Sequence, residues 1–280
     1  MVDVTSPPDV HLGPFLVAAP AVAASFTGPR MTALVGAVAV LAQSLVAIAR
    51  TSINDLKEAE AQIGGDLYAA ARTTNGTRLI IGDVRGKGLS AIGEAASVLG
   101  AFHALSHQES QLPDLVAHLE ASIALDENPT AHEGVDDDQD LAESFVTAAV
   151  LDIPDASTEL RLVSCGHPPP LLLRAGEAIP LKVRTPAPPL GLTHLVVTEH
   201  TAETFTFGVG DTLLLYTDGV IESRDRSGIF CPLPERAALR CGQGPDSLLE
   251  SLCADLVRHA GGRLGDDAAL VAIERLPASG

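Results

Sequence analysis

The sequence predicts an α+β sandwich in which mainly antiparallel strands are covered by a few helices. Strand-like and helix-like patterns come in clusters along the chain and do not alternate strictly, which argues against a parallel α/β fold. The connections between the later strand-like segments contain proline and glycine and are mostly too short for crossover helices, which favours antiparallel pairing. We expect these elements to form one domain over residues 63–276 of the 280-residue chain.

The domain is expected to begin with a β-hairpin. Two strand-like segments, 67–74 and 77–81, flank the dipeptide Asn75-Gly76. Asn-Gly is the strongest short hairpin signal, because both central residues of a type I′ turn take positive φ. We therefore predict two antiparallel strands joined by a two-residue turn.

Helices and further strands follow in order. Apolar residues recur at helical spacing over 89–102, 112–123 and 248–257, which predicts three helices. The acidic segment 126–140 has no periodicity, and we expect a solvated surface loop there. Further strands are expected at 145–153, 160–164, 171–174, 204–207, 212–217 and 268–274.

The N-terminal region is strongly apolar and predicts a membrane anchor. Residues 31–49 are 19 uncharged residues bounded by Arg30 and Arg50, close to the ~20 that a helix needs to cross a bilayer. A second uncharged run, 12–28, is interrupted by two prolines. The first nine residues lack the basic residues of a signal peptide, so we expect a retained anchor within 12–49, as one span or as a two-span hairpin.

The alternative for this region is a buried core helix rich in alanine and valine. If it is an anchor, the positive-inside tendency of Arg50 and Lys57 places the following domain in the cytoplasm. The predicted organisation is then a hydrophobic membrane segment at 1–50, a polar, helix-favouring connector at 51–62 and the domain at 63–276.

Charge and cysteine content argue against several classes of function. The chain has 18 basic and 36 acidic residues, a net charge of −18, which repels nucleic acid. Its four cysteines have neither C-x-x-C spacing nor the matched histidine spacing of a zinc site. We expect reduced thiols and no nucleic-acid partner.

The predicted hairpin brings two carboxylates together. A two-residue loop at Asn75-Gly76 places Asp66 opposite Arg85, which makes Asp83 a diagonal neighbour of Asp66 on the same face, with Cα atoms ~7–8 Å apart. Carboxylates this close repel each other unless a cation lies between them. Magnesium or manganese suits such an oxygen-rich site.

Two further acidic positions have the same character. Asp218 ends a strongly apolar strand in LLLYTDGV, and Asp266-Asp267 precede the last strand in GDDAALVAI. A carboxylate at the end of a buried strand needs a partner when it loses water. Four such positions in one domain predict a metal centre.

Two other kinds of site are disfavoured by spacing. The segment GDVRGKG is one residue too short for a Walker loop and has glycine after Lys87 in place of serine or threonine, which argues against a nucleotide-binding enzyme. In CGHPPP, Cys165 and His167 have no orienting third group, so we predict a turn with a small buried cysteine and no nucleophile.

Six segments of the chain form an ordered set of motifs: IGGDLY, GDVRGKGLSA, ESFVTAAVLDI, LRLVSCGHPPPLLLR, GDTLLLYTDGVIESRD and GDDAALVAI. On these motifs, from about Ile63 to Glu274, the chain resembles the sporulation-stage-II-type (SpoIIE-like) branch of the bacterial metal-dependent PPM, or type 2C, protein serine/threonine phosphatases. It is most similar to their membrane-anchored actinobacterial members. The resemblance implies a four-layer α-β-β-α sandwich with two manganese or magnesium ions between the ends of two mainly antiparallel sheets.

The resemblance also implies the roles of individual residues. Asp66 of GGD would be a metal ligand, and Asp83 of GDV would bridge both ions. The carbonyl of Val84, Asp218 of TDG and Asp266 of GDD would complete the centre. These four aspartates are the predicted catalytic residues, acting through the metals.

The implied reaction is hydrolysis of phosphoserine or phosphothreonine by metal-activated water on a regulatory protein, an anti-anti-sigma factor of the STAS type. Arg85 and Lys87 either hold the substrate phosphate or lie in an exposed loop. The chain departs from the family at Ala69, where an auxiliary carboxylate is common, and we expect the strand that usually precedes GGD to be lost or replaced. The alternative is therefore a catalytically impaired, phosphatase-like binding module in a partner-switching system.

Overall fold

The structure is a computed structural model that describes residues 48–52, 58–63, 65–86, 89–126, 145–192, 199–262 and 264–277. The predicted membrane segment lies outside these residues except for Ile48 and Ala49, and the predicted acidic loop lies outside them except for Asp126. Within the described ranges, no helix has both the length and the apolar character that a membrane span requires.

Two β-sheets form the centre of the domain. Sheet A has the strand order β1-β11-β10-β7-β8, and sheet B has the order β2-β3-β4-β5-β6-β9. Neighbouring strands are antiparallel except for β1 and β11, which are parallel. The strands of sheet A are β1 Ile48–Ser52, β7 Leu171–Arg174, β8 Glu177–Pro180, β10 Thr212–Tyr216 and β11 Leu270–Glu274. Those of sheet B are β2 Glu58–Ile63, β3 Asp66–Arg72, β4 Gly76–Val84, β5 Val146–Pro154, β6 Glu159–Cys165 and β9 Glu203–Thr206.

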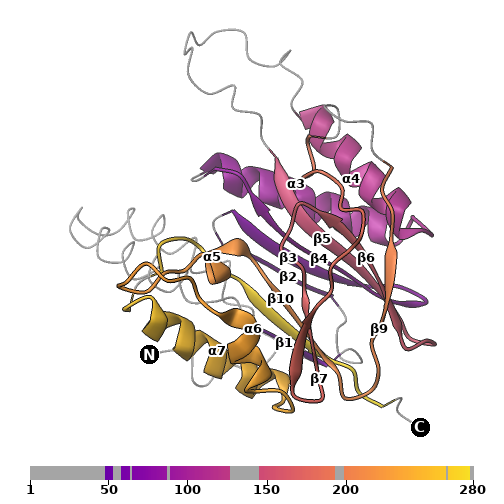
Figure 1. Ribbon diagram of the computed structural model, residues 1–280. Coiled ribbons are helices and arrows are strands. Elements are labelled where there is room, and N and C mark those ends of the chain that lie inside the picture. The colour runs from indigo at the N-terminus through magenta and orange to yellow at the C-terminus, as the bar shows by residue number, and fades with distance from the viewer. Residues whose placement is uncertain are drawn as a thin grey trace, which may run out of the picture. The chain divides into compact units, whose positions relative to one another are not determined.

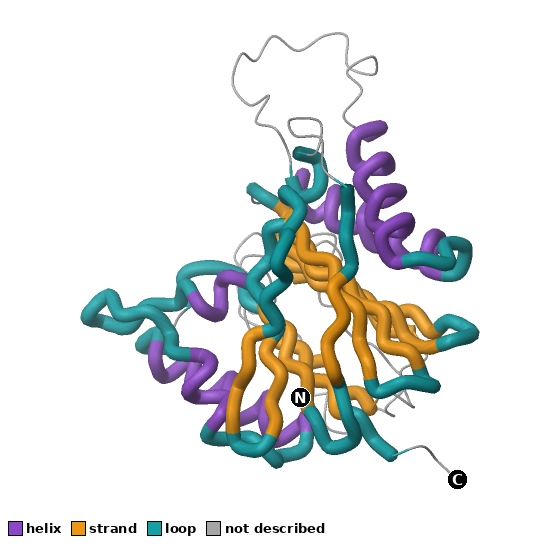
Figure 2. Tube along the Cα trace, turned by 45° about the vertical axis from the view of Figure 1, so that its right-hand side comes forward, coloured by secondary structure: helices purple, strands orange, loops and turns teal. Residues whose placement is uncertain are grey.

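Helices cover the outer faces of both sheets (Figures 1 and 2). Helices α3 Leu89–Ser106 and α4 Leu112–Asp126 pack on sheet B, whereas α6 Leu233–Ala238 and α7 Pro245–His259 pack on sheet A. The short α5 Asp218–Ile221 follows β10. The arrangement is the predicted four-layer sandwich, with mixed α and β structure and mainly antiparallel sheets.

Side chains alternate between the two faces of each strand in sheet B, and each face packs into its own apolar core. In β3, Leu67 and Ala69 belong to the apolar cluster that includes α3 and α4, whereas Tyr68 and Ala70 belong to the cluster between the two sheets. Both faces of sheet B are therefore buried, which explains why its central strands are apolar almost throughout.

The expectation that the strand before GGD is missing is wrong. Strand β2 pairs antiparallel with β3, with Ile63 opposite Asp66, and β1 pairs with β11. A helix-favouring connector was predicted at 51–62 because this segment is rich in alanine and glutamate. The segment EAEAQI also alternates with a period of two, and tertiary pairing with β3 overrides the weak helix propensity. Strand β2, with its glutamates, is the edge strand that shields β3.

The β3–β4 hairpin is present, but its register differs from the prediction. Asp66 lies directly opposite Asp83, and the N–H of Thr73 donates to the carbonyl of Gly76 over 2.9 Å. The two-residue loop is therefore Thr74-Asn75, and neither of these residues takes positive φ.

Gly76 serves a different purpose from the one predicted. A Cβ atom at this position would lie 2.3 Å from the carbonyl oxygen of Ile153 on β5. Glycine is needed because the neighbouring backbone approaches closely, and a type I′ turn is not involved.

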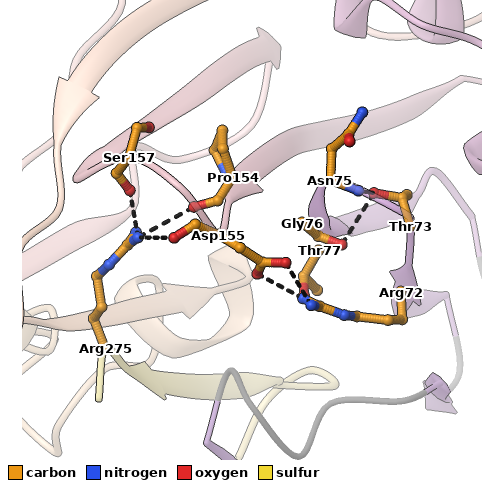
Figure 3. Close-up of polar contacts among 9 residues, drawn as sticks. All are labelled: Arg72, Thr73, Asn75, Gly76, Thr77, Pro154, Asp155, Ser157 and Arg275. Atoms are coloured by element: carbon orange, nitrogen blue, oxygen red, sulfur yellow. Dashed lines mark hydrogen bonds and ion pairs between the residues drawn. The ribbon is translucent and has the colours of Figure 1, made fainter. Parts of the chain in front are cut away.

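At the end of the sandwich away from Asp66, two arginines connect neighbouring segments of the chain (Figure 3). Arg72, at the end of β3, donates two hydrogen bonds to the carboxylate of Asp155, at 2.8 and 2.5 Å. Arg275, which follows β11, donates to the carbonyls of Pro154 and Ser157. The Arg72–Asp155 contact ties β3 to the end of β5 within sheet B, and the Arg275 contacts join sheet A to sheet B.

Candidate metal centre

Asp66 and Asp83 form a carboxylate pair at one end of sheet B. Asp66 is the first residue of β3, Asp83 is the penultimate residue of β4, and the two are direct cross-strand partners. Directly opposite residues have Cβ atoms about 4.5–5.5 Å apart, so the pair is closer than the predicted diagonal placement. Asp66 is only 3% exposed, which makes an unpartnered negative charge there costly.

Thr217 connects this pair to sheet A. It follows β10, is fully buried, and its hydroxyl donates to Oδ2 of Asp66 over 2.8 Å. The same hydroxyl oxygen accepts the N–H of Ala269 over 2.9 Å. The sequence indicates Asp218 in TDG but not Thr217, because an uncharged side chain next to an acidic residue carries no signal of its own.

The other predicted carboxylates lie close by. Asp218 begins α5, and a Cβ atom on Gly219 would lie 1.8 Å from the carbonyl oxygen of Asp267. The start of α5 is thus pressed against the Asp266–Asp267 segment. Asp218 is half-buried and Asp266 is exposed. Asp267, half-buried, was noted in the sequence but was not predicted as a ligand.

The pKa values of the central pair reflect this crowding. Burial, followed by the charges of Asp83, Asp218 and Asp267, raises the pKa of Asp66 to about 8, although the Thr217 hydrogen bond opposes the rise. Burial and the charges of Asp218, Asp266 and Asp267 raise the pKa of Asp83 to about 6. Five carboxylates therefore act on one another at this end of the sandwich, and a cation among them would relieve the repulsion.

Gly65 leaves room beside two oxygen atoms. A Cβ at this position would lie 2.8 Å from the Val84 carbonyl oxygen and 3.1 Å from Oδ1 of Asp83. The predicted donors of Val84 and Asp83 thus converge on a space that a side chain would fill. All predicted donors are oxygen atoms, which fits a hard cation such as Mg²⁺ or Mn²⁺. Across the described ranges, no three His, Cys, Asp or Glu side chains are already drawn together as a metal-binding group.

His167 forms a second bridge between the sheets. Its Nε2 lies 3.1 Å from the carbonyl oxygen of Tyr216 and its Nδ1 lies 3.1 Å from the hydroxyl of Thr147. Because a carbonyl only accepts, Nε2 carries the proton and Nδ1 accepts from Thr147. Burial lowers the pKa of His167 to about 4, so the ring is neutral.

Both partners of His167 lie close to predicted metal ligands. Thr147 is the cross-strand partner of Asp83 on β5, and Tyr216 lies two residues before Asp218. The predicted turn at CGHPPP is present, with Gly166 at φ +68°. Burial raises the pKa of the Cys165 thiol to about 12, which makes it a poor nucleophile. The bridging role of His167 was not predicted.

Of the two basic residues after Asp83, Arg85 alone lies within the described residues. Arg85 is exposed and its guanidinium lies 5.2 Å from the centre of the Phe145 ring. Lys87 lies outside the described residues.

Comparison with known families and structures identifies related proteins. The family model Stage II sporulation protein E (SpoIIE) matches residues 73–276. The RsbU and RsbW domains of Rv1364c from Mycobacterium tuberculosis align with a TM-score of 0.61 and 24% identity over 78% of this chain and 57% of that one. The PP2C phosphatase domain of SpoIIE from Bacillus subtilis, with a fragment of its regulatory domain, gives 0.56 and 16% over 77% and 61%. RsbX in complex with magnesium gives 0.52 and 15% over 77% and 90%.

These structural similarities establish the fold. At 24% identity and below, they show that the sandwich is of the PP2C type. The chain spans 57% of the length of the two-domain Rv1364c structure and 61% of the SpoIIE structure.

Proposed function

We propose that this chain, which belongs to the Stage II sporulation protein E (SpoIIE) family, is a metal-dependent protein serine/threonine phosphatase. The observation that carries the proposal is the Asp66–Asp83 pair, with Asp66 buried and Asp83 half-buried, which lies near Asp218 and the Asp266–Asp267 segment at one end of a PP2C-type sandwich. Carboxylates brought together in this way are suited to hold divalent cations.

The residues that would hold the cations are Asp66, Asp83, Asp218 and Asp266, with the carbonyl oxygen of Val84. When bound, two Mg²⁺ or Mn²⁺ ions supply an activated water and neutralise the phosphoryl oxygens. Of the protein groups, Thr217 orients the Asp66 carboxylate through its 2.8 Å hydrogen bond. His167 holds β5, the strand that pairs with the one carrying Asp83, in place relative to the end of β10.

The presence of β2 removes the main reason for the alternative, a catalytically impaired binding module. The absence of a carboxylate at Ala69 also affects the candidate metal centre less than the family motif suggests. It is fully buried in the core between sheet B and the helices α3 and α4, on the opposite face of β3 from Asp66. A carboxylate at position 69 would point away from the paired aspartates, so its absence takes no oxygen from them.

The proposed substrate is a phosphoserine or phosphothreonine on an anti-anti-sigma factor of the STAS type. Support comes from family membership and from the structural similarity to an RsbU domain. The strongly acidic chain, with a net charge of −18, favours a protein substrate over nucleic acid.

Localisation at the membrane is a separate part of the proposal. Residues 12–49 would anchor the chain, and the phosphatase domain would lie in the cytoplasm. The support is the uncharged composition of this region; its last two residues, Ile48 and Ala49, belong to β1. Fractionation of cells that express the full chain tests this part, and recovery entirely in the soluble fraction would contradict it.

Hydrolysis of p-nitrophenyl phosphate by the full chain tests the proposed activity. We expect turnover that depends on manganese, is abolished by EDTA and falls at least a hundredfold in Asp83→Asn. Asp155→Asn is a matched control, because Asp155 lies at the opposite end of the sandwich. Metal-independent turnover, or an Asp83→Asn variant as active as the wild type, would overturn the proposal.

A further inference from the structure

A basic hollow lies on the sheet A side of the domain, apart from the carboxylates. It has a volume of about 610 Å³ and is lined by residues of the loop 225–227, of helix α6 and of the end of helix α7. This volume is within the range of ligand-binding clefts. The charged and titratable groups that line it are Asp225, Arg226, Arg236, Asp255, Arg258 and His259.

The two acidic residues of the hollow already have partners. The Asp255 carboxylate accepts from Arg240 and Arg258. Oδ1 of Asp225 accepts the backbone N–H groups of Ser227 and Ile229, at 2.7 and 2.9 Å. Backbone hydrogen bonds, chiefly from the N–H of Ile229, lower the pKa of Asp225. Burial has the largest single effect on Asp255 and raises its pKa, but the Arg258 hydrogen bond and the charges of Arg240, Arg258 and Arg236 together outweigh burial and lower it. Both carboxyls are therefore ionised at neutral pH.

Two guanidinium groups are left to face the hollow. Arg236 donates to the backbone carbonyl of Asp255 over 3.1 Å and to Nδ1 of His259 over 3.0 Å, and neither partner is a carboxylate. Within the described ranges, neither Arg226 nor Arg236 forms an ion pair. Guanidinium groups bind carboxylates through paired hydrogen bonds.

Segments that border the hollow carry exposed apolar side chains. Ile229 and Phe230, on the loop that borders it, are 62% and 49% exposed, and Leu239, just after α6, is 84% exposed. Arginines beside exposed aliphatic and aromatic side chains are typical of protein interfaces. A small inorganic anion would use the guanidinium groups and leave these side chains in water.

We infer that this hollow is a docking site for an acidic segment of a partner protein that alternates carboxylates with apolar residues. The carboxylates bind Arg226 and Arg236, and the apolar side chains cover Ile229, Phe230 and Leu239. Because the surface of the chain is otherwise dominated by its charge of −18, an acidic partner is attracted here and repelled elsewhere. This docking requires no hydrolysis and does not depend on the proposed phosphatase activity.

Fluorescence anisotropy with the full chain tests this inference. The probe is a fluorescein-labelled peptide of alternating glutamate and leucine, and the comparison peptide has lysine in place of glutamate. We expect saturable binding of the acidic peptide only, weakened by added salt. Arg226→Ala and Arg236→Gln should each raise Kd roughly tenfold, and Phe230→Ser should raise it as well.

Lys182→Ala is the matched control, because Lys182 is an exposed cation that does not line the hollow. Arg226 is also exposed, so its removal should leave the melting temperature unchanged. The inference is overturned if the acidic peptide does not bind the wild-type chain, if the lysine peptide binds equally well, or if Arg226→Ala, Arg236→Gln and Lys182→Ala all bind like the wild type. The phosphatase proposal is unaffected by each of these results.

Discussion

Replacing Thr217 by valine should weaken metal binding without touching a metal ligand. The hydroxyl of Thr217 donates to Asp66 over 2.8 Å and accepts from the N–H of Ala269 over 2.9 Å. Valine has nearly the same shape but neither donates nor accepts a hydrogen bond. Without the hydroxyl, the Asp66 carboxylate loses the group that opposes the rise in its pKa, so it holds its proton more tightly in competition with a cation.

The size of the effect follows from the hydrogen bond that is lost. A hydrogen bond to a charged group contributes about 1.5–3 kcal/mol, which corresponds to a roughly 10- to 150-fold loss of manganese affinity. Isothermal titration calorimetry of the full chain with Mn²⁺ at neutral pH measures it. Thr217→Ser keeps the hydroxyl and should bind manganese within a few-fold of the wild type. If Thr217→Val binds manganese as tightly as Thr217→Ser, the inferred role of Thr217 is wrong.

Three further predictions follow from the same end of the sandwich. His167→Leu loses the hydrogen bonds on both sides of the ring, so the free energy of unfolding measured in urea should fall by about 2 kcal/mol. The kcat should fall by a larger factor than KM changes. An unchanged kcat would exclude a positioning role for His167. The carboxyl groups of Asp66 and Asp83 have pKa values of about 8 and about 6 when folded, both raised from 3.8, so the metal-free folded chain binds more protons than the unfolded chain. Its stability in urea should therefore fall as pH rises from about 4 to about 8, and less steeply in Asp66→Asn. A rise in stability over this range would contradict the raised pKa values of the two carboxyls. Gly219→Ala places a Cβ against the carbonyl of Asp267 and should lower the free energy of unfolding by at least about 1–3 kcal/mol. Gly228→Ala is the control: no atom lies near the added Cβ, so this variant should show only the smaller cost of a positive φ.

Much of the fold could be predicted from local patterns, because the central strands and helices bury regular faces. The helices at Leu89–Ser106 and Leu112–Asp126 follow from apolar spacing, and the central strands follow from continuous apolar segments. Strand β2 could not be predicted in this way. Although it alternates with a period of two, its residues favour helix, and what makes it a strand is pairing with the edge of β3.

The register of the β3–β4 hairpin shows a second limit. The Asn-Gly rule considers only the residues of the turn itself. It predicted Arg85 as the cross-strand partner of Asp66, two residues beyond the true partner, Asp83. In the structure, the position of Gly76 is dictated by the close approach of β5, a contact between strands that are remote in sequence. The conclusion that Asp66 and Asp83 share a face was correct because an error of two residues keeps side chains on the same side of a strand.

The acidic residues of the candidate site were predictable, and the groups that position them were not. Carboxylates at the ends of apolar strands attract attention because burying them is costly. Thr217 and His167 act through hydrogen bonds across the two sheets, and nothing in their own sequence neighbourhoods reveals which strands will meet there.

Manganese binding to the full chain, compared between the wild type and Asp83→Asn, tests the central claim most directly. If the end of the sandwich is a two-metal centre that Asp83 helps to hold, titration calorimetry should show two bound ions per wild-type chain and loss of at least one of them in Asp83→Asn, while Asp155→Asn binds like the wild type. Equal binding by the wild type and Asp83→Asn, or no binding by the wild type, would contradict the account.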